Sequence, residues 1–475
     1  MKITNGYSVM VNGWKYISIK GTAYERGFAY GALCAEDFKD IQKMLSFFIF
    51  ESYGLTWEYF IYEINKSVSN KIQSRYPEFF EEMVGIVKGC VSKGTHTTIE
   101  EILAWNFYMS IPYWHSSILA PSESHMNTKE GGGSRDKCSA FIAVGDYTHD
   151  GKIVVAHNSF TEFLDGQYMN LIVDISPTTG YRMIMQTSPC WIWSGTDFFV
   201  TSAGIIGTET TIGGFFAYEN NMPICFRIRE AMQYGKTMDD YVNILVAENS
   251  GDYANSWLFG DINTNEILRL ELGLKYHNVE RTRNGYYIGF NATYDPRIRN
   301  LECHNDGFND IRRHQGARKV RLNDLMEQHK GKINIHIAQQ IISDHYDVYL
   351  HKENPCSRTV CSHYELDGRE YMSQVGRPLP YSPRGAVDGV VCDSTMAKNM
   401  SFLCKWGASC DIPFDAKKFC DKNRQWEYLL PYLNDRPTQP WTIFSILRKD
   451  SKYQNTHKKI KRNKSNKNKK SKRTK

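Results

Sequence analysis

The 475-residue chain lacks the compositional marks of several protein classes. It has only 35 Gly and 15 Pro and shows no fixed repeat, which excludes collagen-like and repeat architectures. Its 12 Cys are too sparse for a disulfide scaffold. By contrast, 41% of the residues are hydrophobic and 13% are aromatic, so the chain can bury a large core and is not disordered as a whole.

Long apolar runs are also scarce. Residues 1–15 contain no apolar stretch of the kind that marks a secretory signal, so no signal is visible and the compartment stays open. Residues 102–122 are uncharged and long enough to test as a membrane span. Pro112 and several polar side chains interrupt this stretch. We therefore expect a buried helix that runs into a loop, and no transmembrane anchor.

Acidic residues are missing from the C-terminal tail. Residues 451–475 hold 12 Lys or Arg and no Asp or Glu, while the whole chain carries +6, so the other 450 residues carry −6. The body is therefore mildly acidic, and we expect no specific nucleic-acid binding. The tail is expected to be disordered, either as a solubilising extension or as a segment that contacts polyanions.

Several catalytic motifs are absent as well. The chain has no GxxxxGK[ST] phosphate loop, no HExxH and no GxSxG, so kinase, zincin and serine-hydrolase interpretations have no support. Cys356, Cys361 and His363 lie close together in the sequence, but they are only three ligands and a second cysteine pair is missing. We expect no metal and no cofactor.

The apolar patterns predict an α+β protein with strands in the middle of the chain and helices on both sides. Helical periodicity covers 26–61, 72–91, 311–326 and 333–342. A hydrophilic loop with three consecutive glycines covers 121–137. Strands are expected at 14–20, 138–144, 152–157, 168–175, 183–185, 198–206, 257–261, 266–271 and 286–290.

Cys138 lies where the hydrophilic loop ends and the first central strand begins. If the Lys137–Cys138 peptide is cut, Cys138 becomes a chain terminus with both a thiol and an α-amino group. An α-amino group titrates near pH 8 and can take the thiol proton without a separate base. The alternative is a small buried hydrophobic residue at a strand edge.

The motifs around Cys138 occur in the order found in phospholipase B-like proteins, and the chain resembles that family over about residues 14–435. These proteins are members of the N-terminal-nucleophile hydrolase superfamily. The motifs in the second part are 138–142 (CSAFI), 155–159 (VAHNS), 193–199 (WSGTDFF), 207–212 (GTETTI), 250–257 (SGDYANSW), 346–351 (YDVYLH) and 385–389 (GAVDG). Residues 21–31 (GTAYERGFAYG) and 101–106 (EILAWN) look like the opening motifs of the related penicillin acyltransferase-type cysteine hydrolases.

The resemblance implies a four-layer αββα sandwich that cleaves itself between Lys137 and Cys138. Residues 1–137 would form a helix-rich N-terminal fragment, 138–450 the catalytic chain and 451–475 the Lys-rich tail. The cut protein would hydrolyse an acyl ester or amide through a thioester on Cys138. Family members are usually secreted or lysosomal, but this chain shows no signal and its basic tail is not a family feature, so the localisation is not carried over.

The resemblance also assigns roles to three supporting residues. His157 matches the active-site histidine of the family, with a core histidine as the alternative. Asn291 resembles the asparagine that stabilises the oxyanion, although Asn291-Ala-Thr293 is also a formal glycosylation sequon. Thr211 aligns with a hydroxyl that lines the site. Thr210 would face the other side of the strand, so only one of the two threonines can serve.

Other charged and sulfur-containing residues are less specific. Arg312 and Arg313 could anchor a phosphate or carboxylate, but a surface pair is the favoured interpretation. Because the family carries a close cysteine pair near Cys356 and Cys361, a disulfide or a reduced structural pair is favoured there over a metal site.

Three functions follow. The leading hypothesis is a self-processing cysteine hydrolase that acts on acyl esters of phospholipids or other lipids. The runner-up is an amidase or acyltransferase on N-acyl substrates, because the catalytic centre is common to both and specificity depends on pocket shape. The third is an inactive scaffold that uses its basic tail as a tether.

Overall fold

The computed structural model describes residues 1–119, 137–304, 307–368 and 381–446. The predicted loop 121–137, apart from Lys137, and the tail 451–475 lie outside the described residues.

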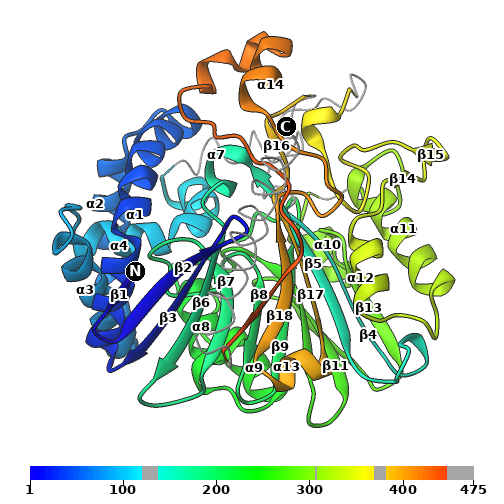
Figure 1. Ribbon diagram of the computed structural model, residues 1–475, viewed down its shortest axis with the longest axis horizontal. Coiled ribbons are helices and arrows are strands. Elements are labelled where there is room, and N and C mark those ends of the chain that lie inside the picture. Colours follow the sequence, from blue (N-terminus) through cyan, green and yellow to red (C-terminus); the bar gives the residue numbers. More distant parts are fainter. Residues whose placement is uncertain (120–136, 305–306, 369–380, 447–475) are drawn as a thin grey trace, which may run out of the picture.

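Two β-sheets pack face to face, and helices cover the outer face of each (Figure 1). In the described chain the first sheet has ten strands, all antiparallel except for the parallel pair β3–β6. In spatial order they are β1 Lys2–Ile3, β2 Gly6–Val11, β3 Trp14–Gly21, β6 Leu171–Pro177, β7 Met183–Thr187, β8 Phe198–Thr201, β9 Ile205–Thr211, β10 Asn255–Asp261, β11 Glu266–Leu272 and β12 His277–Thr282.

The second sheet contains the strand that begins at Cys138. Its order is β13 Gly285–Gly289, β4 Cys138–Val144, β5 Val154–Glu162, β17 Asp388–Asp393, β18 Ser401–Trp406 and β19 Thr442–Ser445, with β16 Arg384–Ala386 paired to β5. A small separate pair is β14 Tyr346–Asp347 with β15 Lys352–Glu353. Strands β4 and β13 lie against β10 and β11 of the first sheet, and β4 also contacts β9.

Helices complete the outer layers (Figure 1). Helix α1 packs on β2 and β3 and α9 on β10 and β11, while α11 and α12 cover the second sheet over β13, β5 and β17. The αββα sandwich predicted from the sequence is therefore confirmed. The helices are α1 Ala23–Tyr53, α2 Trp57–Arg75, α3 Pro77–Val91, α4 Ile99–Asn106, α5 Ile111–Trp114, α7 Phe163–Gly166, α8 Ile224–Tyr234, α9 Met238–Val246, α10 Pro296–Leu301, α11 His314–Gln328, α12 Ile335–Ile342, α13 Ser394–Lys398 and α14 Ala416–Lys422.

Local sequence explains where the N-terminal helices begin and end. Thr22 and Glu25 form a capping box at the start of α1, and Gly54 ends the helix with a left-handed φ of 66°. Pro77 occupies the first turn of α3, where its missing N–H costs nothing. The prediction of continuous helical periodicity over 26–61 and 72–91 was wrong at these two breaks.

Most predicted strands are confirmed, but 198–206 is not one strand. Strand β8 ends at Thr201 and β9 begins at Ile205, with Gly204 at φ 89° in the turn between them. Strands β4 and β5 pair antiparallel as predicted. The stretch that begins at residue 102 runs through α4 and α5, which are mostly buried, and the described residues contain no helix long and apolar enough to cross a membrane.

The segments before and after residue 137 share one sheet and one core. Strand β3 is hydrogen-bonded along its length to β6, with Lys15 opposite Leu171 and Gly21 opposite Pro177. Trp14 of the first segment belongs to the same buried cluster as Val173. Cleavage before Cys138 would therefore leave two chains that stay associated.

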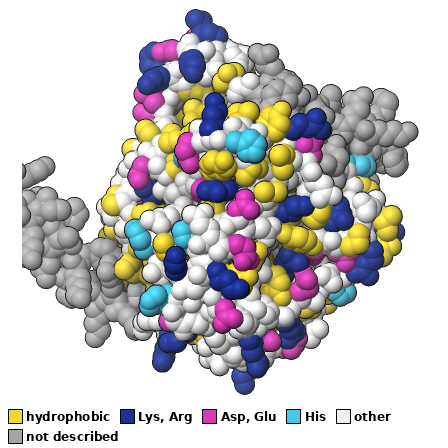
Figure 2. Space-filling view, turned by 90° about the vertical axis from the view of Figure 1, so that its right-hand side faces the viewer, with side chains coloured by type: hydrophobic (Ala, Val, Ile, Leu, Met, Phe, Trp, Pro, Cys, Tyr) yellow, Lys and Arg dark blue, Asp and Glu magenta, His cyan; other side chains and the backbone are white. Residues whose placement is uncertain are grey.

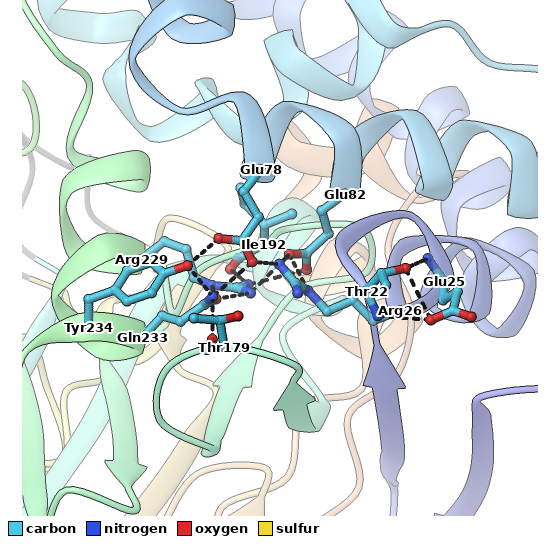
Figure 3. Close-up of polar contacts among 10 residues, drawn as sticks. All are labelled: Thr22, Glu25, Arg26, Glu78, Glu82, Thr179, Ile192, Arg229, Gln233 and Tyr234. Carbon is cyan, nitrogen blue, oxygen red and sulfur yellow. Dashed lines mark hydrogen bonds and ion pairs between the residues drawn. The ribbon is translucent and has the colours of Figure 1, made fainter.

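A buried ion-pair network fixes the segment between β7 and β8 (Figure 3). Glu82 of α3 accepts hydrogen bonds from Arg26 of α1 at 2.7 Å and from Arg229 of α8 at 2.9 Å, and all three side chains are buried. Arg229 also donates to the carbonyl of Ile192 at 2.6 Å. Breaking one partner of such a network leaves an uncompensated buried charge, so the network specifies the position of this segment.

The surface carries both signs of charge. Figure 2 shows basic and acidic side chains interspersed on the face that it presents, with hydrophobic side chains gathered between them. Among the described residues, that face presents no continuous basic stripe of the kind that follows a nucleic-acid backbone.

Candidate active site

Cys138 is the first residue of β4 and lies opposite Ser159 of β5. Its side chain is buried, with 1% of the residue exposed. The peptide before it is held as well, because the backbone N–H of Phe160 donates to the carbonyl oxygen of Lys137 at 2.5 Å. The Lys137–Cys138 bond is thus fixed on the carbonyl side by the neighbouring strand.

A carboxylate faces the thiol. The Sγ of Cys138 donates to Oδ2 of Asp197 at 3.5 Å, and the hydroxyl of Tyr253 donates to the same oxygen at 3.0 Å. Asp197 and Tyr253 have left-handed φ values of 70° and 49°. Non-glycine residues in this region are uncommon, and they persist where the surrounding structure holds them, often at functional sites.

The electrostatics favour the protonated, neutral forms of these groups. Burial raises the pKa of the Cys138 thiol well above its usual value, and the nearby Asp197 and Glu209 raise it further. Burial also raises the pKa of Asp197 to about 7. Glu209 has a pKa raised by burial and by Asp197. Before any cleavage, Cys138 is therefore a thiol, and Asp197 can exchange a proton near neutral pH.

His157 lies beside Cys138, as the hairpin prediction required. It is opposite Ala140 in the β4–β5 register, and one ring nitrogen lies within 4.8 Å of both Cys138 Sγ and an Asp197 carboxylate oxygen. Burial lowers the pKa of His157 to about 3, so the ring is neutral. Among the described residues no side chain bonds either ring nitrogen, and the Glu209 backbone partly offsets the effect of burial on the pKa of the ring.

Asn291 contacts Cys138 from the end of β13. Its Oδ1 accepts from the Cys138 backbone N–H at 3.4 Å and from Nη2 of Arg318 at 2.9 Å, while its Nδ2 donates to the Thr211 carbonyl at 2.7 Å. Asn291 is fully buried and has a left-handed φ of 63°. A glycan could not reach this side chain in the folded chain, and the oxyanion role of Asn291 stays a prediction.

Arg318 is a site residue that the sequence reasoning missed. Its Nη1 donates to the Cys138 carbonyl at 2.8 Å and to Ser139 Oγ at 3.2 Å. The sequence reasoning considered Arg312 and Arg313 of the same region, and the structure pairs both with Asp310. Arg312 is largely exposed, which agrees with the surface interpretation.

The two threonines face opposite sides of β9. A Cβ added to Gly289 of the second sheet would lie 2.4 Å from Thr210 Cγ2, so Thr210 points between the sheets. Thr211 contacts Asn291 through its carbonyl oxygen, and its hydroxyl lies near the Tyr253 phenol. Thr211 thus joins the site through its neighbours, and its predicted role in lining the site stays a prediction.

Asp197, Glu209 and Tyr253 were also missed. Each of them falls inside one of the motifs that carry the family resemblance, at 193–199, 207–212 and 250–257. For Asp197 the available signal was an acidic residue directly before Phe198 and Phe199, because an acidic residue among core aromatics rarely serves packing alone.

Among the residues that the structure describes, two groups of side chains could hold a metal ion by ligand type. Cys138, His157 and Asp197 provide three donors, the number that a catalytic zinc site uses, but the thiol and the carboxylate already bond to each other. The second group contains Cys361, whereas Cys356 lies 3.6 Å from Asp347. All cysteines of the described chain are free thiols, so Cys356 and Cys361 form no disulfide.

Comparisons with known proteins identify the family. The family model described as phospholipase B matches residues 3–270. An uncharacterized protein from Archaeoglobus fulgidus is 22% identical over 256 residues, which is 53% of this chain and 42% of that protein. Putative phospholipase B-like 2 from Rattus norvegicus is 27% identical over 171 residues, which is 30% of this chain and 27% of that protein.

The mouse protein of the same name, from Mus musculus, is 26% identical over 171 residues, covering 30% of this chain and 26% of that protein. The chain thus spans less than half the length of each of these relatives. Among solved structures, a variant of conjugated bile acid hydrolase from Clostridium perfringens matches 58% of this chain and 83% of that chain, with a TM-score of 0.28 and 10% identity.

Proposed function

Because the chain belongs to the phospholipase B family, we propose that it is a self-processing cysteine hydrolase that cleaves acyl ester bonds of lipids through a thioester on Cys138. The observation that carries the proposal is the arrangement around one peptide bond. Cys138 Sγ faces Asp197, while the Lys137 carbonyl accepts a hydrogen bond from Phe160 N–H.

Self-cleavage would begin with Asp197 as the base, since Cys138 has no free amine in the uncut chain. The thiol proton passes to the Asp197 carboxylate and Sγ attacks the Lys137 carbonyl carbon. The Phe160 N–H stabilises the oxyanion. Asp197 returns the proton to the departing Cys138 nitrogen as the C–N bond breaks. Water then hydrolyses the thioester, which leaves a carboxylate on Lys137 and an amine on Cys138.

Substrate hydrolysis would use the new amine. Asn291 Oδ1 already contacts this nitrogen and would hold the amine beside Sγ. The amine takes the thiol proton, Sγ attacks the acyl carbon, and the amine donates a proton to the departing alcohol. Water attacks the acyl thioester and releases the fatty acid. The Asn291 side-chain amide, whose Nδ2 donates to the Thr211 carbonyl, is proposed to stabilise the oxyanion.

Arg318 would act as a positioning residue. It bonds both the Cys138 carbonyl and Asn291 Oδ1, so it fixes the nucleophile and the predicted oxyanion donor relative to each other. Its positive charge would also stabilise negative charge that develops nearby.

The test uses the purified full chain and its Cys138→Ala variant. Cut wild-type protein is offered phospholipids, lysophospholipids and N-acyl amides, and free fatty acid is measured. Release from phospholipids that disappears in Cys138→Ala supports the proposal. Release from amides alone would assign the chain to the amidase class instead. A cut protein that hydrolyses none of them would contradict the lipid-hydrolase claim while leaving the nucleophile in place.

A further inference from the structure

Four nitrogen and sulfur side chains meet at a second place in the second half of the chain. They are His345 between α12 and β14, Cys361 and His363 before the short helix Tyr364–Leu366, and Cys410 after β18. One ligand atom from each residue lies within 4.8 Å of all the others. The group goes beyond the proposed function, because the mechanism at Cys138 uses none of these residues.

The distances fit a tetrahedral ion. Nε2 of His363 lies 3.5 Å from Cys361 Sγ and 3.2 Å from Cys410 Sγ. Zinc bonds of about 2.3 Å to sulfur and about 2.0 Å to nitrogen place the ligands of a tetrahedral site about 3.3–3.8 Å apart. The His345 and His363 rings lie 5.0 Å apart at an angle of 68°, so they do not stack on each other.

The surroundings orient the ligands. Nδ1 of His363 is paired with Oε1 of Glu365 at 2.7 Å, which leaves Nε2 directed at the two sulfurs. A carboxylate on the far nitrogen is the usual partner of a metal-binding histidine. Ser409 Oγ donates to Cys361 Sγ at 3.4 Å, a contact that suits a thiolate. Both Cys361 and His363 are fully buried.

We propose that His345, Cys361, His363 and Cys410 bind a zinc ion. Two thiolates and two imidazoles in tetrahedral reach form the donor set that zinc prefers in structural sites, and harder ions such as Mg²⁺ or Ca²⁺ take oxygen ligands instead. A disulfide between Cys361 and Cys410 is the competing arrangement. In that case the imidazoles of His345 and His363 would point at sulfur atoms that carry neither a proton nor a negative charge.

The ion would clamp segments that support the Cys138 strand. Asn158 of β5 donates to the carbonyls of Ile342 and Val360 at 3.0 and 3.3 Å, and its Oδ1 accepts from the Ser139 N–H. Ile342 and Val360 lie three residues and one residue from the ligands His345 and Cys361. The site is therefore structural, and its loss is expected to loosen the peptide next to the nucleophile.

The experiment measures metal content of the full chain purified from zinc-supplemented medium. We expect about one zinc ion per chain in the wild type and less than about a tenth of that in Cys410→Ser. Cys138→Ala and Cys356→Ser are matched controls, since both remove a buried thiol outside the cluster, and both should keep the metal. Removing zinc with a chelator should lower the Tm of the wild type but not that of Cys410→Ser.

Cobalt gives a second readout that does not depend on the variant folding. Co²⁺ titrated into the metal-free wild type should give the absorption bands of a tetrahedral site with two thiolates, and His345→Cys should keep binding with a shifted spectrum. Absence of both zinc and cobalt binding, metal that survives in a folded Cys410→Ser, or a Cys361–Cys410 disulfide in unreduced wild type would each overturn the proposal.

Discussion

Cys138 begins a strand of the second sheet and Cys410 follows another strand of that sheet, but the two thiols have neighbours of different charge. Around Cys138 the neighbours are carboxyl groups, and burial together with Asp197 and Glu209 raises the pKa of its thiol. Around Cys410 the neighbours are a thiol and two imidazoles, and hydrogen bonds from Cys361, His345 and His363 lower the pKa of its thiol. The first environment keeps the thiol protonated until a base acts, whereas the second favours the thiolate of Cys410, while burial and Cys410 raise the pKa of Cys361.

The histidines of the two groups also differ in pKa: the His157 ring is neutral, whereas the surroundings of His363 favour its charged form. His157 has no carboxylate hydrogen-bonded to its ring among the described residues, and burial lowers its pKa to about 3. Burial would also lower the pKa of His363, but Glu365 and Cys410 raise it to about 10. The same side chain therefore has opposite proton affinities at the two places, because the groups that surround it differ.

The largest expected effect is that of Cys138→Ala. The variant should lose both self-cleavage and hydrolysis, because one sulfur carries out both attacks. Mass spectrometry should find the wild type as residues 1–137 and 138–475, about 16 and 39 kDa, and the variant as one chain of 54.9 kDa. The control variant Cys410→Ser retains Cys138 as the nucleophile and should therefore still be able to cleave itself. Wild type that stays intact after long incubation would contradict the assignment.

Asp197→Asn should slow self-cleavage by about 10²–10⁴-fold, because the amide cannot take the thiol proton. Since the pKa of Asp197 is raised to about 7, the carboxylate that acts as the base appears as the pH rises. The rate of wild-type processing should therefore increase through about pH 7, and the variant should lose that step. Time courses of cleavage at acidic, neutral and alkaline pH provide the measurement, and an unchanged pH profile in the variant would exclude Asp197 as the base.

Asn291→Ala should still process but should lose turnover by about 10²–10³-fold, the cost of an oxyanion donor. The control is Asn158→Ser, which alters a buried asparagine that supports the strand without contacting Cys138 N–H. Initial rates of fatty-acid release on cut protein test the difference. Equal losses in both variants would indicate a general structural effect.

His157 should make the fold sensitive to acid. Its folded pKa of about 3 lies below the unfolded value of 6.5, so the unfolded chain binds the proton more readily and stability falls as the pH drops from 6.5 towards 3. The slope contributed by His157 is at most about 1.4 kcal/mol per pH unit. His157→Gln should flatten the dependence of stability on pH in denaturation curves measured over this range. A slope that the substitution leaves unchanged would show that other groups control the acid response.

The smallest effect is expected from the tail. Deleting residues 451–475 should leave folding and activity unchanged, because a segment with this composition buries almost no apolar surface. Binding to a polyanion such as heparin should weaken, most clearly at low salt. Loss of activity on truncation would show that the tail belongs to the catalytic unit.

Much of the local structure could be predicted from the sequence. Short strand-like runs bounded by turn residues predicted β4 and β5, and helical periodicity predicted α11 and α12 close to their observed bounds. The breaks at Gly54 and Pro77 and the turn at Gly204 were missed, although glycine and proline are ordinary signals for such breaks.

The sequence by itself determined most of the elements, because periodicity acts between residues close in the chain, and the layers and the nucleophile candidate followed from the family resemblance of its motifs. The tertiary structure alone brought Arg318 to Cys138 across 180 residues and Cys410 to His363 across 47. Contacts of this kind depend on how helices and sheets pack, and no short pattern encodes them. For the same reason, the sequence places only Cys361 and His363 near each other, and the fold adds His345 and Cys410 to the group.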